Sequence, residues 1–333
     1  MKYAKIFHGQ DSLTIMRVMI TGASGFLGSW LCRVLSRNHE ITGLVRDTSS
    51  LMKLSDINNL RIIQSETQMW PNLIRELHPD VLVLNHWWGV SSDDRNDSRQ
   101  FENIESVKRL TLAARLAQVS TIIGVGSQAE LGPVESDISE RQIDRPSTLY
   151  GEAKLRSRHV IEELLRESGA RFVWMRIFST YGPLDEGSWL IPNLVDTLMA
   201  NKRMKTTKGQ QEWSYLHAYD LASAFNTAII NSKIVGTVNV GNPETVSISK
   251  VCLTIAKMLD RRELLDIGAL EYREDQVMKL RPLCETLTQS GWLPEISFDE
   301  GIKQTIDWLQ RKSLSPLPTM DGKSIDFKIP IRL

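Results

Sequence analysis

Cysteine is scarce in this chain of 333 residues, and the three cysteines, Cys32, Cys252 and Cys284, do not have the spacing of a metal site. So small and odd a number favours reduced thiols in the cytoplasm over a disulfide framework. No apolar run approaches the roughly 20 residues of a membrane-spanning helix. Residues 1–15 also lack the apolar core of a secretory signal. We therefore expect a cytoplasmic protein without a membrane partner.

Net charge is absent as well, because 40 basic residues balance 40 acidic ones. A chain with no excess of basic residues is not attracted electrostatically to nucleic acid, so we expect no nucleic-acid partner. Any ligand that carries phosphate must then be held by local groups. The composition, 41% hydrophobic and 24% charged, is that of a globular protein that buries a core.

Short apolar runs alternate with amphipathic stretches through the first half of the chain. The runs predict six strands, at 16–21, 40–46, 60–64, 80–84, 121–125 and 172–177. Helical periodicity is clearest at 26–37, 103–117 and 151–167. Alternating strands and helices imply parallel crossovers, so the predicted fold class is α/β, with a doubly wound parallel Rossmann sheet. Beyond residue 180 the regular alternation of predicted strands and helices ends. This change predicts a smaller mixed α/β lobe with helices near 249–260 and 299–311.

A glycine-rich segment, Thr21 to Gly28, lies between the first predicted strand and the first predicted helix. In the spacing G-x-x-G-x-x-G, the glycines permit a tight turn, close approach of the backbone to a pyrophosphate, and close helix–strand packing. The helix N-terminus offers N–H groups to the anion. The alternative is a turn without a ligand. We predict a dinucleotide site formed by Gly22, Ser24, Gly25, Phe26, Leu27 and Gly28.

The end of the second strand bears on the choice of dinucleotide. An acidic residue there binds the ribose hydroxyls of NAD, whereas an arginine accommodates the 2′-phosphate of NADP. Val45 stands where the acid is expected and Arg46 follows it, which favours NADP(H) as the cofactor. NAD(H) stays possible, since a shift of one residue would bring in Asp47. Taken alone, Arg46 is also compatible with a solvated surface side chain.

Tyr150 and Lys154 lie one helical turn apart on the same face of a predicted helix. A tyrosine with its ordinary pKa of ~10 is a poor acid–base at neutral pH, and a neighbouring ammonium lowers that pKa. Ser127, after the fifth predicted strand, is placed to donate to a substrate carbonyl oxygen; the alternative is a serine that caps its own turn. We predict these three as catalytic residues, with Tyr150 and Lys154 also contacting the cofactor.

Together these motifs resemble those of the extended short-chain dehydrogenase/reductases that act on nucleotide-diphosphate sugars, over residues 16–311. The resemblance implies Ser127, Tyr150 and Lys154 as a catalytic triad, and Asn103 as the asparagine that supports the active-site water. It also implies a nucleotide-diphosphate sugar as substrate and a homodimer formed by the helices at 103–117 and 151–167.

The same resemblance sets the expected domains. Residues 1–15 are an N-terminal extension, and 16–180 form the Rossmann domain, to which 214–245 return. Residues 181–213 and 246–312 form the substrate-binding lobe, and 313–333 a tail. The chain departs from the family at Ser179, just before that lobe, and at Trp213 within it, positions that commonly bind the sugar nucleotide, and Arg273 is a candidate replacement. We predict these three as substrate-binding residues.

Three details narrow the implied chemistry. The sugar 4,6-dehydratases of the family carry Thr-Asp-Glu where this chain has Ser127-Gln128-Ala129, which disfavours dehydration. Arg46 suits a net reductase that uses NADP(H). The segments 126–133 and 268–278 resemble the CDP-abequose and CDP-paratose synthases, which reduce a 4-keto sugar nucleotide.

The predicted function is therefore an NADPH-dependent reductase of the 4-keto group of a nucleotide-diphosphate 6-deoxyhexose. The alternatives are a sugar-nucleotide epimerase with tightly bound NAD and an NADP-sensing binding protein on the same fold. His86, after the fourth predicted strand, is either functional or a packed, hydrogen-bonded histidine.

Overall fold

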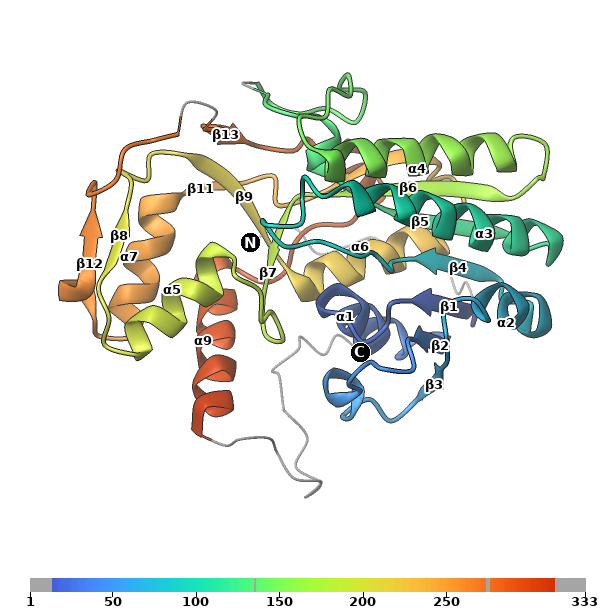
Figure 1. Cartoon of the computed structure of the whole chain (residues 1–333), viewed down its shortest axis with the longest axis horizontal. Helices are drawn as coiled ribbons and strands as arrows, with labels where there is room; N and C mark the ends of the chain where they lie inside the picture. Colours follow the sequence, from blue (N-terminus) through green and yellow to red (C-terminus); the bar gives the residue numbers. More distant parts are fainter. Residues whose placement is uncertain (1–13, 135, 274–275, 315–333) are drawn as a thin grey trace, which may run out of the picture.

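A parallel seven-stranded sheet forms the centre of the computed structural model, which describes residues 14–134, 136–273 and 276–314 (Figure 1). The order across the sheet is β10-β6-β5-β4-β1-β2-β3. Its strands are β1 (Arg17–Thr21), β2 (Glu40–Val45), β3 (Leu60–Gln64), β4 (Val81–Leu84), β5 (Thr121–Ser127), β6 (Arg171–Ile177) and β10 (Gly236–Val240). The predicted α/β fold is confirmed. Strand β5 runs two residues further than predicted, so Ser127 is its last residue.

Helices cover both faces of this sheet, because its strands are apolar on both sides. On one face lie α1 (Phe26–Leu35) and α6 (Ala218–Ile230), which bury Trp30 and Phe225. The other face carries α2 (Trp70–Leu77), α3 (Glu102–Leu116) and α4 (Leu149–Leu165).

The strand order reverses between β1 and β4. From β1 the chain proceeds to β2 and β3 on one side, and from β4 to β5 and β6 on the other. In open parallel sheets, ligands bind in the crevice outside the carboxyl ends of the strands at such a point. The glycine loop after β1 and the loop after β4 both begin at this crevice, with the end of β5 beside them.

A second, smaller lobe follows. Its four-stranded sheet contains β7 (Ser179–Tyr181), β9 (Glu212–His217), β11 (Thr245–Ser247) and β13 (Lys279–Leu280), and a two-stranded sheet pairs β8 (Met204–Thr206) with β12 (Leu265–Ile267). The helices α5 (Leu190–Met199), α7 (Ile248–Met258) and α9 (Phe298–Leu314) pack on each other around a core of their own (Figure 1).

Two of the expected domain boundaries need correction. The chain returns to the large sheet with α6, after residue 217 and not at 214, because β9 pairs with β7, β11 and β13. Helix α8 (Glu285–Gln289) falls in the range expected for the substrate-binding lobe, yet Leu287 and the nearby Trp292 are buried in the core beside α6. Most of the expected extension (1–15) and tail (313–333) lies outside the described residues, which begin at 14 and end at 314. Within the described ranges, no helix has the length and apolar character needed to cross a membrane.

Candidate functional site

The glycine loop joins β1 to α1 at the reversal of the strand order. Gly22 has a φ of +67°, which an L side chain rarely adopts, and the N–H of Gly22 donates to Leu44 O at 2.9 Å. Thr21 Oγ1 accepts from the N–H groups of Asn85 and His86 at 3.0 and 3.2 Å. These bonds join the loop to the ends of β2 and β4.

The three glycines of this loop differ in what their missing side chains would meet. A Cβ on Gly28 would lie 2.2 Å from Gly22 O, and one on Gly22 would lie 2.8 Å from His86 Cα, so both are needed for packing. A Cβ on Gly25 would meet nothing closer than Gly22 O at 3.4 Å, and Gly25 is exposed with a φ of −72°. The protein itself therefore does not require glycine at 25.

Gly25 is the N-cap of α1, and no side chain caps this helix. The N–H groups of its first turn, contributed by residues such as Phe26 and Leu27, have no partner within the helix. The N-terminus of α1 has uncapped N–H groups, and the glycine at its N-cap lets a ligand come close to the backbone. Such a helix end fits the pyrophosphate of a dinucleotide. Ser24 lies half-buried in the same loop. The residues present therefore fit the predicted cofactor.

Arg46 follows the last residue of β2 and is exposed. Among the described residues its guanidinium makes no hydrogen bond or ion pair. The carboxylate of Asp47 accepts from Thr48 N at 3.0 Å and so caps its own turn. Val45 is buried. Arg46 and Asp47 are both exposed at this position, and the choice between NADP(H) and NAD(H) stays a prediction.

Ser127, Tyr150 and Lys154 are brought together at the carboxyl end of β5. The side chain of Ser127 lies close enough to Tyr150 to lower the pKa of its phenol, and Lys154 Nζ donates to Val125 O at 2.8 Å. Ser127 Oγ also accepts from Ala129 N at 3.2 Å, so this serine caps its own turn as well. The interpretation of Ser127 as the cap of its own turn is confirmed, and its catalytic role stays a prediction.

The electrostatics of Tyr150 differ from the sequence-based expectation. Burial raises the pKa of its phenol, and the charge of Arg95 and the side chain of Ser127 oppose that rise. Burial lowers the pKa of Lys154 itself to about 7, an effect that the charge of Glu130 opposes. Lys154 Nζ lies 5.8 Å from the centre of the Tyr150 ring, and its effect on the pKa of Tyr150 stays a prediction.

Asn103, on α3, holds the loop after β4. Its Oδ1 accepts from Trp88 N at 2.8 Å, and its Nδ2 donates to Trp88 O and Gln100 O, both at 3.1 Å. This use of both ends of the amide fixes the backbone beside the predicted catalytic residues. The role that the resemblance implies for Asn103, support of a water, stays a prediction.

His86 lies in the same loop and packs against Trp70. Its ring nitrogens lie 3.0 Å from Thr21 Oγ1 and 2.8 Å from Ser106 Oγ. Burial lowers its pKa to about 3, so the imidazole is neutral at physiological pH. The packed, hydrogen-bonded interpretation of His86 is the one that fits.

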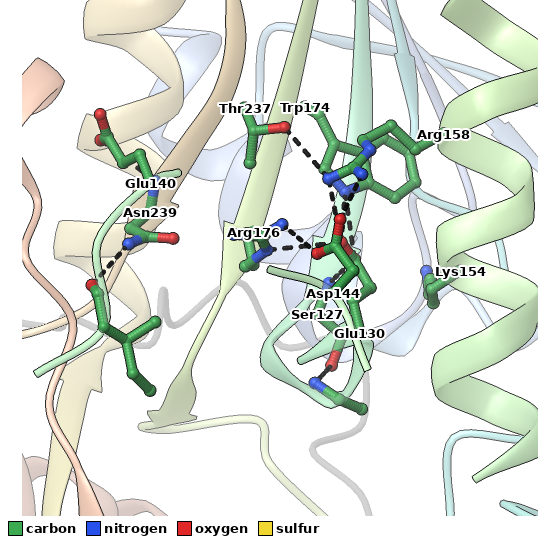
Figure 2. Close-up of polar contacts among 12 residues, drawn as sticks. Ser127, Glu130, Glu140, Asp144, Lys154, Arg158, Trp174, Arg176, Thr237 and Asn239 are labelled. Carbon is green, nitrogen blue, oxygen red and sulfur yellow. Dashed lines mark hydrogen bonds and ion pairs between the residues drawn. The ribbon is translucent and has the colours of Figure 1, made fainter. Parts of the chain in front are cut away.

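Next to Ser127 lies a buried charge cluster, formed by Glu130, Asp144, Arg158 and Arg176 (Figure 2). Glu130, at the end of the short 3₁₀ helix η3 (Gln128–Glu130), is fully buried; its Oε1 accepts from Ser127 N at 2.6 Å, and both its oxygens accept from the Trp174 indole. Arg176 and Arg158 approach Glu130 Oε2 at 3.4 and 3.8 Å.

Asp144 completes this charge cluster, because it binds Arg176 at 2.8 Å and Arg158 at 2.6 Å. Two carboxylates thus face two guanidinium groups. A Cβ on Gly124 or Gly126 would approach the Trp174 ring to 2.3 Å, so these glycines make room for the indole that holds Glu130. The cluster fixes the peptide of Ser127 through the hydrogen bond that Ser127 N donates to Glu130.

The predicted substrate-binding residues lie in and near the small lobe. Ser179 is half-buried in β7, and Trp213, in β9, donates its indole N–H to Val277 O at 3.0 Å. Arg273 lies next to residues 274–275, which are outside the described residues. Trp213 thus packs within the lobe, and substrate binding by these three residues stays a prediction.

Sequence reasoning missed four residues at the site. Trp87 packs its ring 3.7 Å from Lys154 Nζ, and Arg95 lies over the Tyr150 ring. Trp189, the N-cap of α5, contacts Arg95 from the small lobe. Glu130 was visible in the segment 126–133, but its neighbours in space come from distant parts of the chain. Only the folded structure places these side chains together.

Comparison with known proteins gives one family. The model of the NAD dependent epimerase/dehydratase family matches residues 18–241. A protein from Bacillus subtilis (strain 168) named uncharacterized UDP-glucose epimerase YtcB is 26% identical, over 75% of this chain and 84% of its own length. The dTDP-D-glucose 4,6-dehydratase of Homo sapiens is 24% identical, over 91% of this chain and 95% of its own.

Solved structures have the same fold. UDP-N-acetylglucosamine 4-epimerase from Methanobrevibacter ruminantium M1 superposes with a TM-score of 0.80 at 18% identity, covering 90% of this chain and 99% of that one. UDP-glucose 4-epimerase from Thermus thermophilus, in complex with NAD, gives a TM-score of 0.78 at 20% identity, covering 89% and 99%.

Proposed function

Because this chain belongs to the NAD dependent epimerase/dehydratase family, we propose that it transfers hydride at C4 of a nucleotide-diphosphate sugar, as an NADPH-dependent 4-ketoreductase. The observation that carries the proposal is the gathering of Ser127, Tyr150 and Lys154 at the crevice of the Rossmann sheet, beside a glycine loop that fits a dinucleotide. The bound nicotinamide supplies the hydride.

In the proposed reaction Ser127 orients the C4 oxygen through its hydroxyl. Tyr150 then gives its phenolic proton to that oxygen as negative charge develops on it. The Lys154 ammonium, held by Val125 O, lies one turn away and would contact the cofactor ribose when the cofactor is bound. The charge cluster behind Ser127 keeps its peptide in place.

Dehydration fits the site less well than reduction. Water elimination needs an acid–base pair beside the sugar, and the two residues after Ser127 are Gln128 and Ala129. Glu130 follows, but it is fully buried and its carboxylate is occupied by Ser127 N, Trp174 and Arg176. Neither a free acid nor a free base stands at this position. Reduction and epimerisation require neither.

Epimerisation is the second candidate, and the comparisons favour it, because the two solved structures described above are 4-epimerases. An epimerase keeps NAD and returns the hydride to the same carbon. The two candidates differ in the fate of the cofactor: a reductase consumes NADPH, whereas an epimerase purifies with NAD and turns over without added NADPH.

The preference for NADPH rests on Arg46. Replacing it with alanine is expected to raise the Kd for NADPH about tenfold to a hundredfold, since a hydrogen bond to a charged group is worth about 1.5–3 kcal/mol. The Kd for NADH should change little. Quenching of tryptophan fluorescence measures both. Arg61→Ala is the control, because Arg61 is exposed on β3 opposite Thr42, nearer the amino ends of the strands. Tighter binding of NADH than NADPH by the unaltered protein would contradict this assignment.

The homodimer stays part of the proposal. Helices α3 and α4 pack against each other on one face of the sheet, and α3 exposes Leu112 and Leu116, the latter with 71% of its surface accessible. An exposed leucine pair on paired helices suits the four-helix interface that the family resemblance implies.

A further inference from the structure

The guanidinium of Arg95 lies over the ring of Tyr150, the proton donor of the proposed reaction. It belongs to the loop between β4 and the 3₁₀ helix η2 (Ser98–Phe101), and its guanidinium carbon lies 5.0 Å from the centre of the Tyr150 ring. The N–H of Tyr150 donates to Arg95 O at 2.8 Å, and Leu149 N donates to Asn96 Oδ1 at 3.2 Å. The loop is therefore tied by its backbone to the start of α4, which carries Tyr150.

The charge of Arg95 has no acidic partner among the described residues. Its side chain makes no hydrogen bond or ion pair there, and its Nε is buried without an acceptor. The guanidinium carbon also lies 5.3 Å from the centre of the Trp189 ring. Arg99, in the same segment, is different, because it is bound to Asp97 at 2.6 Å and lies over Trp88. Arg95 is thus a cation that contacts two aromatic rings and has no acidic partner among the described residues.

Three charged groups act on Tyr150 from the elements packed around it: Arg95 from the loop, Lys154 from α4 and Glu130 from η3. Lys154 Nζ is 5.8 Å from the centre of the Tyr150 ring, is hydrogen-bonded to Val125 O and lies on Trp87. Because burial lowers its pKa to about 7, its charge is partial at neutral pH. An arginine keeps its charge throughout this range.

We propose that Arg95 is a cation that stabilises the phenolate of Tyr150. When Tyr150 gives its proton to the sugar oxygen, its O–H bond breaks and the electron pair stays on the phenolic oxygen. The negative charge then develops beside a guanidinium that no carboxylate among the described residues neutralises. Arg95 acts through Tyr150 and is a positioning residue. The proposal rests on the proposed function only in taking Tyr150 as the proton donor.

The test is a titration that needs neither substrate nor cofactor. A fluorinated tyrosine placed at position 150 of the full-length chain titrates at lower pH than tyrosine, and its ¹⁹F resonance reports ionisation of this one side chain. In Arg95→Met the midpoint is expected to rise by about one pKa unit or more, since a nearby opposite charge lowers a pKa by about 1–3 units. Arg95→Lys should recover part of the shift.

Arg99→Met is the matched control, because it removes a cation that lies over Trp88. The titration midpoint of residue 150 is expected to change by no more than ~0.2 pKa units, because the charge of Arg99 is exposed to solvent, screened by salt and paired with Asp97. The pH profile of kcat/KM should move with the titration in the Arg95 variants. An unchanged midpoint in both Arg95→Met and Arg95→Lys, together with a rise in Lys154→Met, would overturn the proposal and assign the role to Lys154. If the sugar-nucleotide reaction itself is misassigned, activity is absent while the titration result stands.

Discussion

Tyr150→Phe is expected to lower kcat about 10²–10⁴-fold, the range that a positioned general acid contributes. The substitution removes only the hydroxyl. The ring that contacts Arg95 and Trp87 stays, and the buried position remains filled. We therefore expect the Kd values for cofactor and sugar nucleotide to change less than threefold, a difference below about 0.7 kcal/mol. Single-turnover absorbance at the nicotinamide wavelength measures the chemical step, and fluorescence titration measures binding.

This variant also separates an enzyme from a binding protein. If Tyr150→Phe keeps full biological function, the residue is not needed for proton transfer and the alternative of an NADP-sensing protein returns. Tyr219→Phe is a suitable control, because Tyr219 lies on α6, on the opposite face of the sheet from α4.

Glu130→Ala is expected to cause the largest loss of stability. Removing one partner of a buried ion pair costs about 3–5 kcal/mol, because the charge left behind has no compensation. Here Arg176, which is 1% exposed, would be left with Asp144 alone, and the Trp174 indole and Ser127 N would lose their acceptor. The free energy of unfolding, measured in urea by circular dichroism, should fall by that amount.

Glu162→Ala provides the contrast within the same cluster. Glu162 lies 3.6 Å from Arg158, but its side chain is 45% exposed, so the pair is screened by solvent. Its removal should change the free energy of unfolding by less than about 1 kcal/mol. Equal, small losses in both variants would show that the buried cluster does not hold the end of β5 in place.

The sequence predicts the fold well because the relevant signals are local. A buried parallel strand is a short apolar run, and the glycine loop has a fixed spacing between a strand and a helix; both kinds of pattern can be seen without knowledge of partners in space. For the same reason the sequence correctly places Ser127, Tyr150 and Lys154 as neighbours at one edge of the sheet.

The parts that the sequence could not predict depend on contacts between distant residues. Arg95 lies in an irregular loop, and its neighbours Tyr150 and Trp189 are 55 or more positions away along the chain. Glu130 meets Arg176 only through the pairing of β5 with β6. The spacing of Tyr150 and Lys154 predicts that they share a helix face, but not that Trp87 and Val125 O engage the ammonium.

Transfer of deuterium from NADPH to the sugar distinguishes a reductase from an epimerase. The protein is mixed with NADPH that carries deuterium on the reactive face of the nicotinamide and with a panel of nucleoside-diphosphate 4-keto-6-deoxyhexoses, and the products are analysed by mass spectrometry and NMR. Our account predicts that at least one sugar gains one deuterium at C4 for each NADPH consumed. If no sugar gains deuterium, while UDP-glucose is converted to its C4 epimer without consumption of NADPH, the reductase assignment is contradicted and the chain is an epimerase.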